Sequence, residues 1–167
     1  KNALRGKRFQ VFSTNDIVGA ELAGALKNTI AIGAGMLGGL NMGYNIWALL
    51  ITKGLSEMIH IGKAMGANLE PFLGIAGIGD LVVTCTSPHS RNFQAGFKIG
   101  NGKDLEETLA SMTMVVEGIR TCEAAYKYAM EHNLKVPIIQ SIYNVLFLKM
   151  DPEIAKKNLM ERSVKSE

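Results

Sequence analysis

The stretch GAELAGALKNTIAIGAGMLGG, residues 19–39, decides the fold because it sets one lysine in a run of glycine, alanine and aliphatic residues. Its larger apolar side chains recur at the spacing of a helix, and Asn15 or Asp16 can cap the N-terminus of that helix. We expect a buried helix that loosens at the glycines from 33 to 43. The isolated ammonium of Lys27 is the feature that a function must explain.

Capping and proline signals predict further helices along most of the chain. They are expected over 44–65 with Gly66 as a left-handed end, from Asn68 with Pro71 in the first turn, over 90–100 from a Ser90 cap, from Asp104 with Glu107, over 117–132, from Pro137, and from Pro152. The segments DLVVTCT (80–86) and TMVV (113–116) suit either strands or buried helical or extended segments. The fold class is therefore all-α, a multi-helix domain.

The first residues differ from the rest. KRFQVFSTND, residues 7–16, alternates polar and apolar residues and then becomes polar, which is the pattern of a short strand followed by a cap. A lone strand needs a sheet, so it is either an edge element or the end of a preceding domain, and we prefer the second interpretation. We therefore divide the chain into 1–13, a remnant of another domain, and 14–167, one compact helical domain.

Composition excludes several classes of function. The net charge is +3, and no Lys/Arg cluster is dense enough to predict nucleic-acid or lipid binding, although a small anionic ligand fits. Cys85 and Cys122 lack the spacing of a metal site or a disulfide framework, so we interpret both as core thiols and expect no metal. Charged residues interrupt the apolar runs before a membrane span is complete, and no signal peptide is evident. We expect a soluble cytoplasmic protein.

A glycine motif offers one alternative function. Gly33, Gly35 and Gly38 have the G-x-G-x-x-G spacing of a dinucleotide-binding loop, and Glu57 lies at about the distance of a ribose-binding carboxylate. However, the apolar stretch before them continues a helical pattern, and no second strand follows. Small residues that let two helices approach closely are the simpler explanation.

Lys27 and Asp80 form a candidate acid–base pair. The residues three and four positions from Lys27 are small or aliphatic, so its side chain would face a cavity rather than water, where an amine can exchange a proton with a substrate oxygen. Asp80, in GIGDLVVT, is the candidate carboxylate that would orient the amine. The competing interpretations are a surface lysine with its ammonium in water and an aspartate that caps a helix.

The residues Ser90, Arg91 and Asn92 stand at an expected helix start. A hydroxyl, a guanidinium, an amide and unpaired backbone N–H groups there could converge on one phosphate. A simple serine cap beside a surface arginine explains the same pattern, and both interpretations stay open on local grounds.

Four linked motifs resemble one family. ELAGALKN (21–28), GMLGGLNMGYNIWALLITKGLSEM (35–58), GIGDLVVTCTSPHSRN (77–92) and VVEG (115–118) are similar in order and separation to the substrate-binding C-terminal half of NAD(P)-dependent glycerol-3-phosphate dehydrogenase of the bacterial and plastid type. The resemblance covers the chain from about residue 16 onward. It implies a helical fold of the 6-phosphogluconate dehydrogenase C-terminal type.

The resemblance also implies an activity. The family interconverts sn-glycerol 3-phosphate and dihydroxyacetone phosphate, in carbohydrate metabolism and phospholipid biosynthesis, in the cytoplasm or the plastid stroma. NAD or NADP is bound mainly by an N-terminal Rossmann domain, without which this chain is expected to be inactive. The oligomeric state stays open, and a homodimer is one of the assemblies considered.

The family's functional residues match positions of this chain. Lys27 matches the catalytic lysine, Asp80 its carboxylate partner, and Thr84 a polar active-site position. The substrate-binding trio matches Ser90, Arg91 and Asn92, and the positions that touch the cofactor match Arg91, Val115 and Glu117.

Departures from the family pattern concern packing rather than chemistry. Gly38 stands where aspartate is frequent, and Trp47 occupies a site that is usually smaller. An alternative of another class is a helical dimerisation module without its own site, suggested by the Gly/Ala-rich faces of the first two expected helices.

Overall fold

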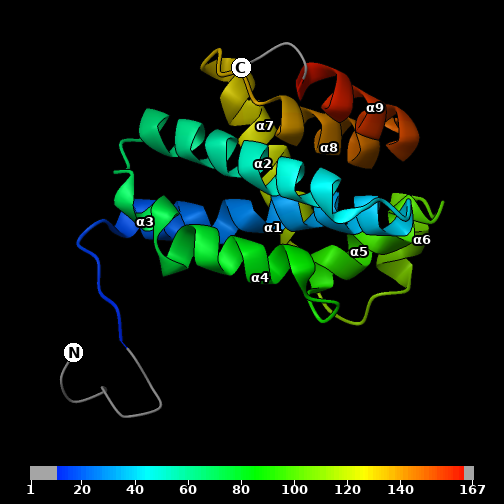
Figure 1. The fold of residues 1–167 in the computed structure, drawn as a ribbon, viewed down its shortest axis with the longest axis horizontal. Coiled ribbons are helices and arrows are strands. Elements are labelled where there is room, and N and C mark those ends of the chain that lie inside the picture. Colours follow the sequence, from blue (N-terminus) through cyan, green and yellow to red (C-terminus); the bar gives the residue numbers. More distant parts are fainter. Residues whose placement is uncertain (1–10, 164–167) are drawn as a thin grey trace.

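The computed structural model describes residues 11–163, and every regular element within this range is a helix (Figure 1). The elements are α1 (Ile17–Gly39), α2 (Tyr44–Ala64), α3 (Glu70–Leu73), the π-helix η2 (Ile75–Gly79), α4 (Asp80–Thr86), α5 (Arg91–Gly100), α6 (Leu105–Ala110), α7 (Glu117–Glu131), α8 (Pro137–Leu148) and α9 (Pro152–Ser163). The predicted all-α fold is confirmed. The sequence left two segments undecided between strand and helical or extended structure. Of these, 80–86 is helical, whereas 113–116 has no regular structure.

The predicted N-terminal strand lies mostly outside the described residues. Residues 11–13, which follow that part, have no regular secondary structure. The boundary at residue 13 therefore stays a prediction.

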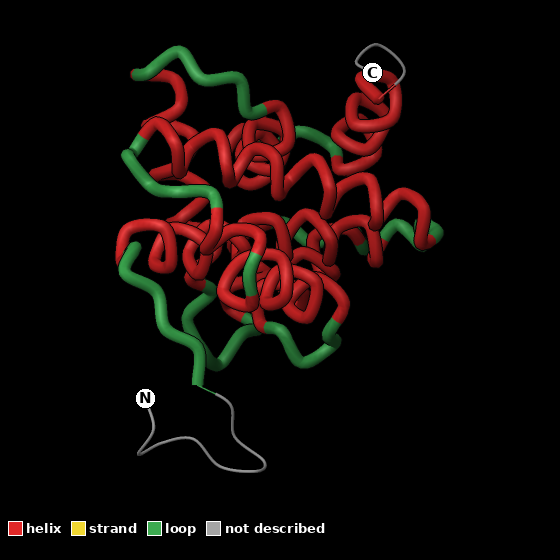
Figure 2. Tube along the Cα trace, turned by 60° about the vertical axis from the view of Figure 1, so that its left-hand side comes forward, coloured by secondary structure: helices red, strands yellow, loops and turns green. Residues whose placement is uncertain are grey.

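Helix α1 is the centre of the domain. It packs against α2, α4, α5, α7 and α8 (Figure 1), and Figure 2 shows from another direction that helices form the body of the domain. In Figure 1, α2 lies above α1 while α4 and α5 lie below it, and α9 packs on α8. None of the helices between residues 11 and 163 is both long enough and apolar enough to cross a membrane.

The glycines of α1 do not loosen the helix, so that expectation is wrong. Instead they form a seam with α5, in which Gly35 and Gly39 of α1 face Gly96 and Gly100 of α5. A Cβ atom added to Gly35 would lie 2.0 Å from the carbonyl oxygen of Phe93, and one added to Gly96 would lie 1.9 Å from that of Ile32. No real Cβ atom fits at such distances, so the two backbones touch only because these residues are glycine.

The dinucleotide-loop alternative is excluded by the same helix. Gly33, Gly35 and Gly38 lie inside α1 rather than in a loop after a strand. A Cβ atom at Gly33 would lie 2.9 Å from Ile142 of α8, so this glycine also serves helix packing. Glu57 is a buried residue of α2 that accepts hydrogen bonds from the backbone of α8.

The two packing departures, Gly38 and Trp47, meet in the structure. A Cβ atom at Gly38 would lie 3.3 Å from the Trp47 indole and 3.2 Å from the Phe93 ring. The Trp47 and Phe93 rings themselves pack edge to face, with centroids 5.6 Å apart. The large indole therefore fills the space that the missing side chain at Gly38 leaves.

Local capping signals were mostly correct. Asp16 caps α1, Ser90 caps α5 and Asp104 caps α6, each through its side-chain oxygen, and Gly66 has the expected positive φ of 83°. Asn68 is the exception, because α3 begins at Glu70 without a side-chain cap. The backbone N–H of Asn68 instead donates to the Asp16 carboxylate at 2.7 Å, a tertiary contact that ties α3 to the start of α1.

Candidate active site

Lys27 of α1 and Asp80 of α4 form an ion pair, in which the ammonium donates to Oδ2 of Asp80. The Lys27 side chain is only 16% exposed, whereas the Asp80 side chain is 43% exposed. The interpretation of Lys27 as a surface lysine with its ammonium in water is therefore wrong. In this pair the ammonium is largely buried, whereas the carboxylate is accessible to solvent.

Asp80 reaches Lys27 because of how α4 begins. The π-helix η2 runs directly into α4, and Gly79 before Asp80 already has helical dihedral angles. Asp80 is therefore the first residue of α4 and not its N-cap. Gly77 holds η2 against α3, since a Cβ atom there would lie 2.1 Å from the Phe72 carbonyl oxygen. The carboxylate is thereby left to face α1 rather than its own backbone.

Thr84 lies one turn after Asp80 and contacts it twice. Its hydroxyl oxygen is 2.6 Å from the backbone carbonyl oxygen of Asp80 and 3.2 Å from Oδ1 of the carboxylate. A hydroxyl has one hydrogen, so it can donate to only one of these oxygens at a time. Thr84 therefore steadies the carboxylate that pairs with Lys27.

The surface of α1 is open one turn before Lys27. Gly24 lies one turn earlier on α1, and a Cβ atom added there would meet nothing within 4 Å. By contrast, Ala23, Ile30 and Ala31 are fully buried. Within residues 11–163, Asp80 is the only hydrogen-bond partner of the ammonium, which leaves two of its three hydrogens to donate.

The nearby cysteines do not supply a nucleophile. Burial raises the pKa of the Cys85 thiol to about 12, and the positive charge of Lys27 opposes this shift without reversing it. Burial also raises the pKa of the Cys122 thiol. Both stay protonated near neutral pH, as expected of core thiols. Among the described residues no group of three or more His, Cys, Asp or Glu side chains could hold a metal ion.

The N-termini of α5 and α7 meet beside Asn28 and Thr29 of α1. The side-chain oxygen of Asn92, in the first turn of α5, accepts the backbone N–H of Gly118 at 2.9 Å. Gly118 also lies against α1, since a Cβ atom there would be 2.5 Å from the carbonyl oxygen of Asn28. The hydroxyl of Thr29 donates to the Gly118 carbonyl at 3.3 Å. Both helix starts are thus fixed to the residues that directly follow Lys27.

Arg91 is exposed at the same end of α5. Its Nη1 atom is 3.8 Å from the sulfur of Met114, so the guanidinium lies beside the segment that leads into α7. Val115 in that segment is 66% exposed, and Glu117 is the exposed first residue of α7. All three residues predicted to contact the cofactor are therefore exposed, and Arg91 contacts the residue that precedes Val115.

Sequence reasoning missed the role of Gly118, which joins the two helix starts. Its signal was present, because it follows Glu117 at an expected helix start where a larger residue would be more common. What the sequence could not show is that Asn28 and Asn92 both press against it.

The sequence of the chain matches a known family. The family described as the C-terminus of NAD-dependent glycerol-3-phosphate dehydrogenase matches residues 16–157. The chain belongs to this family.

Individual relatives agree with this assignment. A glycerol-3-phosphate dehydrogenase (NAD(P)+) from Geobacillus kaustophilus is 52% identical over 159 residues, which are 95% of this chain and 46% of the relative. One from Staphylococcus aureus is 47% identical over 158 residues, again 95% of this chain and 48% of the relative. The chain thus spans about half the length of the curated relatives it matches.

Solved structures extend the likeness to three dimensions. The crystal structure of glycerol-3-phosphate dehydrogenase from Coxiella burnetii has a TM-score of 0.91 at 36% identity, covering 96% of this chain and 49% of that one. The yeast enzyme from Saccharomyces cerevisiae has a TM-score of 0.84 at 24% identity, covering 93% and 46%, and shows the shared fold.

Proposed function

We propose that this chain is the substrate-binding and catalytic half of a glycerol-3-phosphate dehydrogenase, which interconverts sn-glycerol 3-phosphate and dihydroxyacetone phosphate with NAD or NADP. The observation that carries the proposal is the Lys27–Asp80 pair beside the joined N-termini of α5 and α7. It combines a proton-transfer group with an anion-binding end, and a phosphorylated hydroxyketone requires both.

Lys27 would act as the general acid and base. In ketone reduction its ammonium donates a proton to the carbonyl oxygen as the hydride arrives at the second carbon of the substrate. In alcohol oxidation the neutral amine removes the hydroxyl proton as the hydride leaves. Asp80 keeps the amine oriented in both directions, and the low exposure of Lys27 limits competition from water. The cofactor supplies or accepts the hydride.

The phosphate would bind at the starts of α5 and α7. Helix N-termini offer unpaired backbone N–H groups and a positive dipole end, and Arg91 adds an exposed guanidinium. Ser90 accepts a hydrogen bond from the backbone N–H of Phe93, which leaves its own hydroxyl hydrogen to donate. These groups are all donors, as an anionic ligand requires.

The orientation of Asn92 supports this assignment. Because Gly118 offers an N–H donor, the Asn92 atom that faces it must be the oxygen, and the NH₂ group must point the other way. That NH₂ group is then held as a donor for a substrate oxygen. Asn92 would therefore both fix α7 and contact the substrate.

Three residues of this chain would touch the cofactor. Arg91, Val115 and Glu117 are exposed, and Arg91 contacts Met114 beside Val115, so a nicotinamide held mainly by an N-terminal Rossmann domain could reach them. That domain is proposed as the main partner, in a cytoplasmic or plastid setting.

The sequence feature that suggested a dimerisation module is explained by packing within the domain. Gly35 and Gly39 of α1 are covered by α5, while Gly54 and Gly62 of α2 face Ile30 and Phe72 within the domain. The Gly/Ala-rich faces that suggested a partner are therefore occupied internally. Homodimer formation itself stays a prediction.

The test is the kinetics of Lys27→Met in the full-length enzyme. We expect kcat for dihydroxyacetone phosphate reduction to fall by about 100-fold to 10,000-fold, with a much smaller change in KM, because general acid catalysis is removed while the phosphate contacts remain. The control is Lys127→Met, which removes an exposed lysine paired with Glu123 on α7 and should leave kcat unchanged. A Lys27→Met enzyme that keeps more than about a tenth of kcat would refute the assignment.

A further inference from the structure

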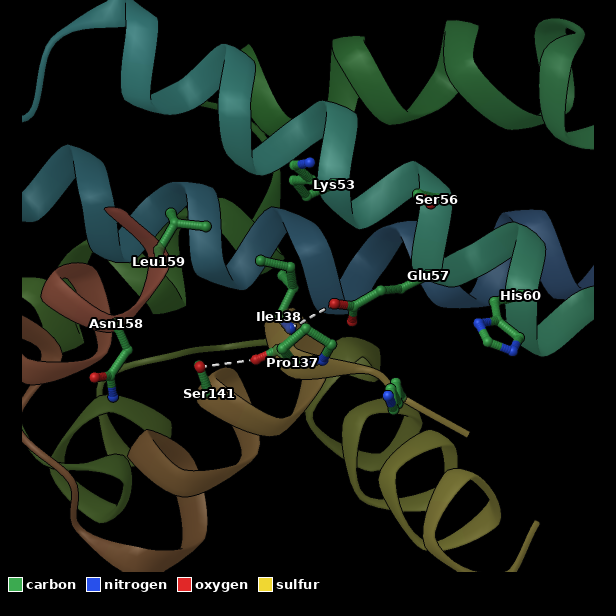
Figure 3. A pocket seen from close by; sticks show the side chains of 10 residues that line it. Lys53, Ser56, Glu57, His60, Pro137, Ile138, Ser141, Asn158 and Leu159 are labelled. Atoms are coloured by element: carbon green, nitrogen blue, oxygen red, sulfur yellow. Dashed lines mark hydrogen bonds between the residues drawn. The ribbon is translucent and has the colours of Figure 1, made fainter. Parts of the chain in front are cut away.

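A polar cavity lies on the opposite side of α1 from α4. It has a volume of about 190 Å³ and opens between α2, the segment before α8, α8 itself and α9 (Figure 3). Its polar lining comes from Lys53, Ser56, His60, Lys135, Ser141 and Asn158. None of the residues assigned above to substrate or cofactor lines it.

Glu57 forms the buried wall of this cavity and has a structural task. One carboxylate oxygen accepts the backbone N–H of Ile138 at 2.6 Å (Figure 3), and the other accepts that of Ile139 at 2.9 Å. The residue is only 6% exposed. Glu57 thus caps the N-terminus of α8 from another helix, where the helix dipole and the two N–H groups stabilise its negative charge.

The remaining charged groups of the cavity are basic. Lys53 of α2 is half-buried, and Lys135 and His60 are exposed at its rim. Within residues 11–163 none of these three side chains makes a hydrogen bond or ion pair. Two lysines and one carboxylate therefore line the cavity, and the oxygens of that carboxylate accept hydrogen bonds from the backbone of α8, so these described groups carry a net positive charge.

The volume limits what the cavity can hold. At about 30 Å³ per water molecule, it corresponds to roughly six waters. Typical sites for drug-sized ligands begin at about 300 Å³, so only a compact ligand of a few heavy atoms fits. Ser56 and Asn158 can donate hydrogen bonds to it, whereas the Ser141 hydroxyl already donates to the Pro137 carbonyl at 2.8 Å and can only accept.

We propose that this cavity binds a small polyvalent anion, with phosphate or carboxylate groups, between Lys53 and Lys135. The site is separate from the phosphate site at α5 and α7 and does not depend on the function proposed above. An anion here would connect α2 with the start of α8 and with Asn158 of α9.

The test is a titration of the ¹⁵N-labelled chain with inorganic phosphate and, separately, with malonate, at constant ionic strength. We expect saturable amide shifts at Ser56, His60 and Ile138 with at least one of the two probes, and the comparison decides between phosphate and carboxylate chemistry. Arg91→Ala should leave these shifts intact, because it alters only the other proposed anion site.

The deciding variant is Lys53→Gln combined with Lys135→Gln. It should weaken binding by about tenfold or more, since each lysine would contribute a charged contact to the anion. The matched control is Lys63→Gln, an exposed lysine of α2 outside the cavity, which should leave the affinity unchanged. Non-saturable shifts, or equal weakening by Lys63→Gln, would overturn the proposal.

Discussion

The C-terminal half of α1 and its stretch around Lys27 differ in how closely they pack against other helices. Toward its C-terminus, glycines bring its backbone into contact with that of α5, and no space is left for even one added carbon. Around Lys27 the same helix carries a charged side chain that pairs with Asp80 of α4, and open space lies at Gly24. One helix can therefore pack closely against a neighbour along part of its length and carry a residue of the candidate site along another part.

The glycine seam between α1 and α5 also positions the polar residues at the start of α5. The seam fixes the position of α5, and the start of α5 carries Ser90, Arg91 and Asn92. Because Asn92 in turn holds Gly118, the placement of α7 also depends on that seam. A change in the seam is therefore expected to affect stability first, whereas a change at the polar end should affect binding first.

The largest effect is expected from Gly96→Ala. Its Cβ atom would lie 1.9 Å from the backbone carbonyl oxygen of Ile32, so one of the two helices must move. We expect the free energy of unfolding to fall by about 3 kcal/mol or more, as measured by urea denaturation.

Gly24→Ala is the matched control for that substitution. It lies in α1 with open space around the added carbon, and alanine should raise the free energy of unfolding by about 0.5–1 kcal/mol. Similar effects of the two substitutions would show that the seam is not as tight as described.

An intermediate effect is expected at Asn92, where scaffold and site meet. Asn92→Ala leaves the buried N–H of Gly118 without its acceptor and should lower the free energy of unfolding by about 1–3 kcal/mol. Asn92→Asp keeps an acceptor, so its loss of stability should be smaller.

For substrate binding, the order of the two Asn92 variants should be the reverse of their order in stability. Asn92→Asp replaces a donor by a negative charge where the substrate phosphate is proposed to lie, so calorimetry with sn-glycerol 3-phosphate should show no binding in the full-length enzyme. If Asn92→Asp binds as well as the wild type, Asn92 does not face the substrate.

The smallest effect is expected from Asp16, far from both regions. The backbone N–H groups of Gly19 and Asn68 donate to its carboxylate and hold the pKa of Asp16 below its usual value of 3.8. A lowered folded-state pKa stabilises the protein above the unfolded-state pKa, and this contribution is lost as the pH falls through the folded-state value.

The measurement compares wild type and Asp16→Ala by urea denaturation from about pH 6 down to about pH 2.5. The wild type should be more stable at the upper end, and the difference should shrink below about pH 4. A difference that stays constant across this range would contradict the role of the ionised carboxylate.

Local interactions were the predictable part of the fold. The caps at Asp16, Ser90 and Asp104 depend on a side chain and a backbone N–H three residues later, so the sequence contains both partners. The error at Asn68 has the same origin, since its backbone found a partner on a distant segment that no local pattern reveals.

The candidate site divides in a similar way. The sequence by itself determined that the chain is helical, that Lys27 is a charge without local polar neighbours, and that a donor-rich helix start follows at Ser90. Periodicity and capping act over a few residues and are therefore written in the sequence.

Only the tertiary structure decided that Lys27 meets Asp80, that Asn92 turns its oxygen to Gly118, and that Glu57 caps α8 rather than binding a ribose. These partners lie far apart along the chain. They meet because the glycine seam and the packing around α1 fix the helices in one arrangement, and contacts of that range depend on how all the helices pack together.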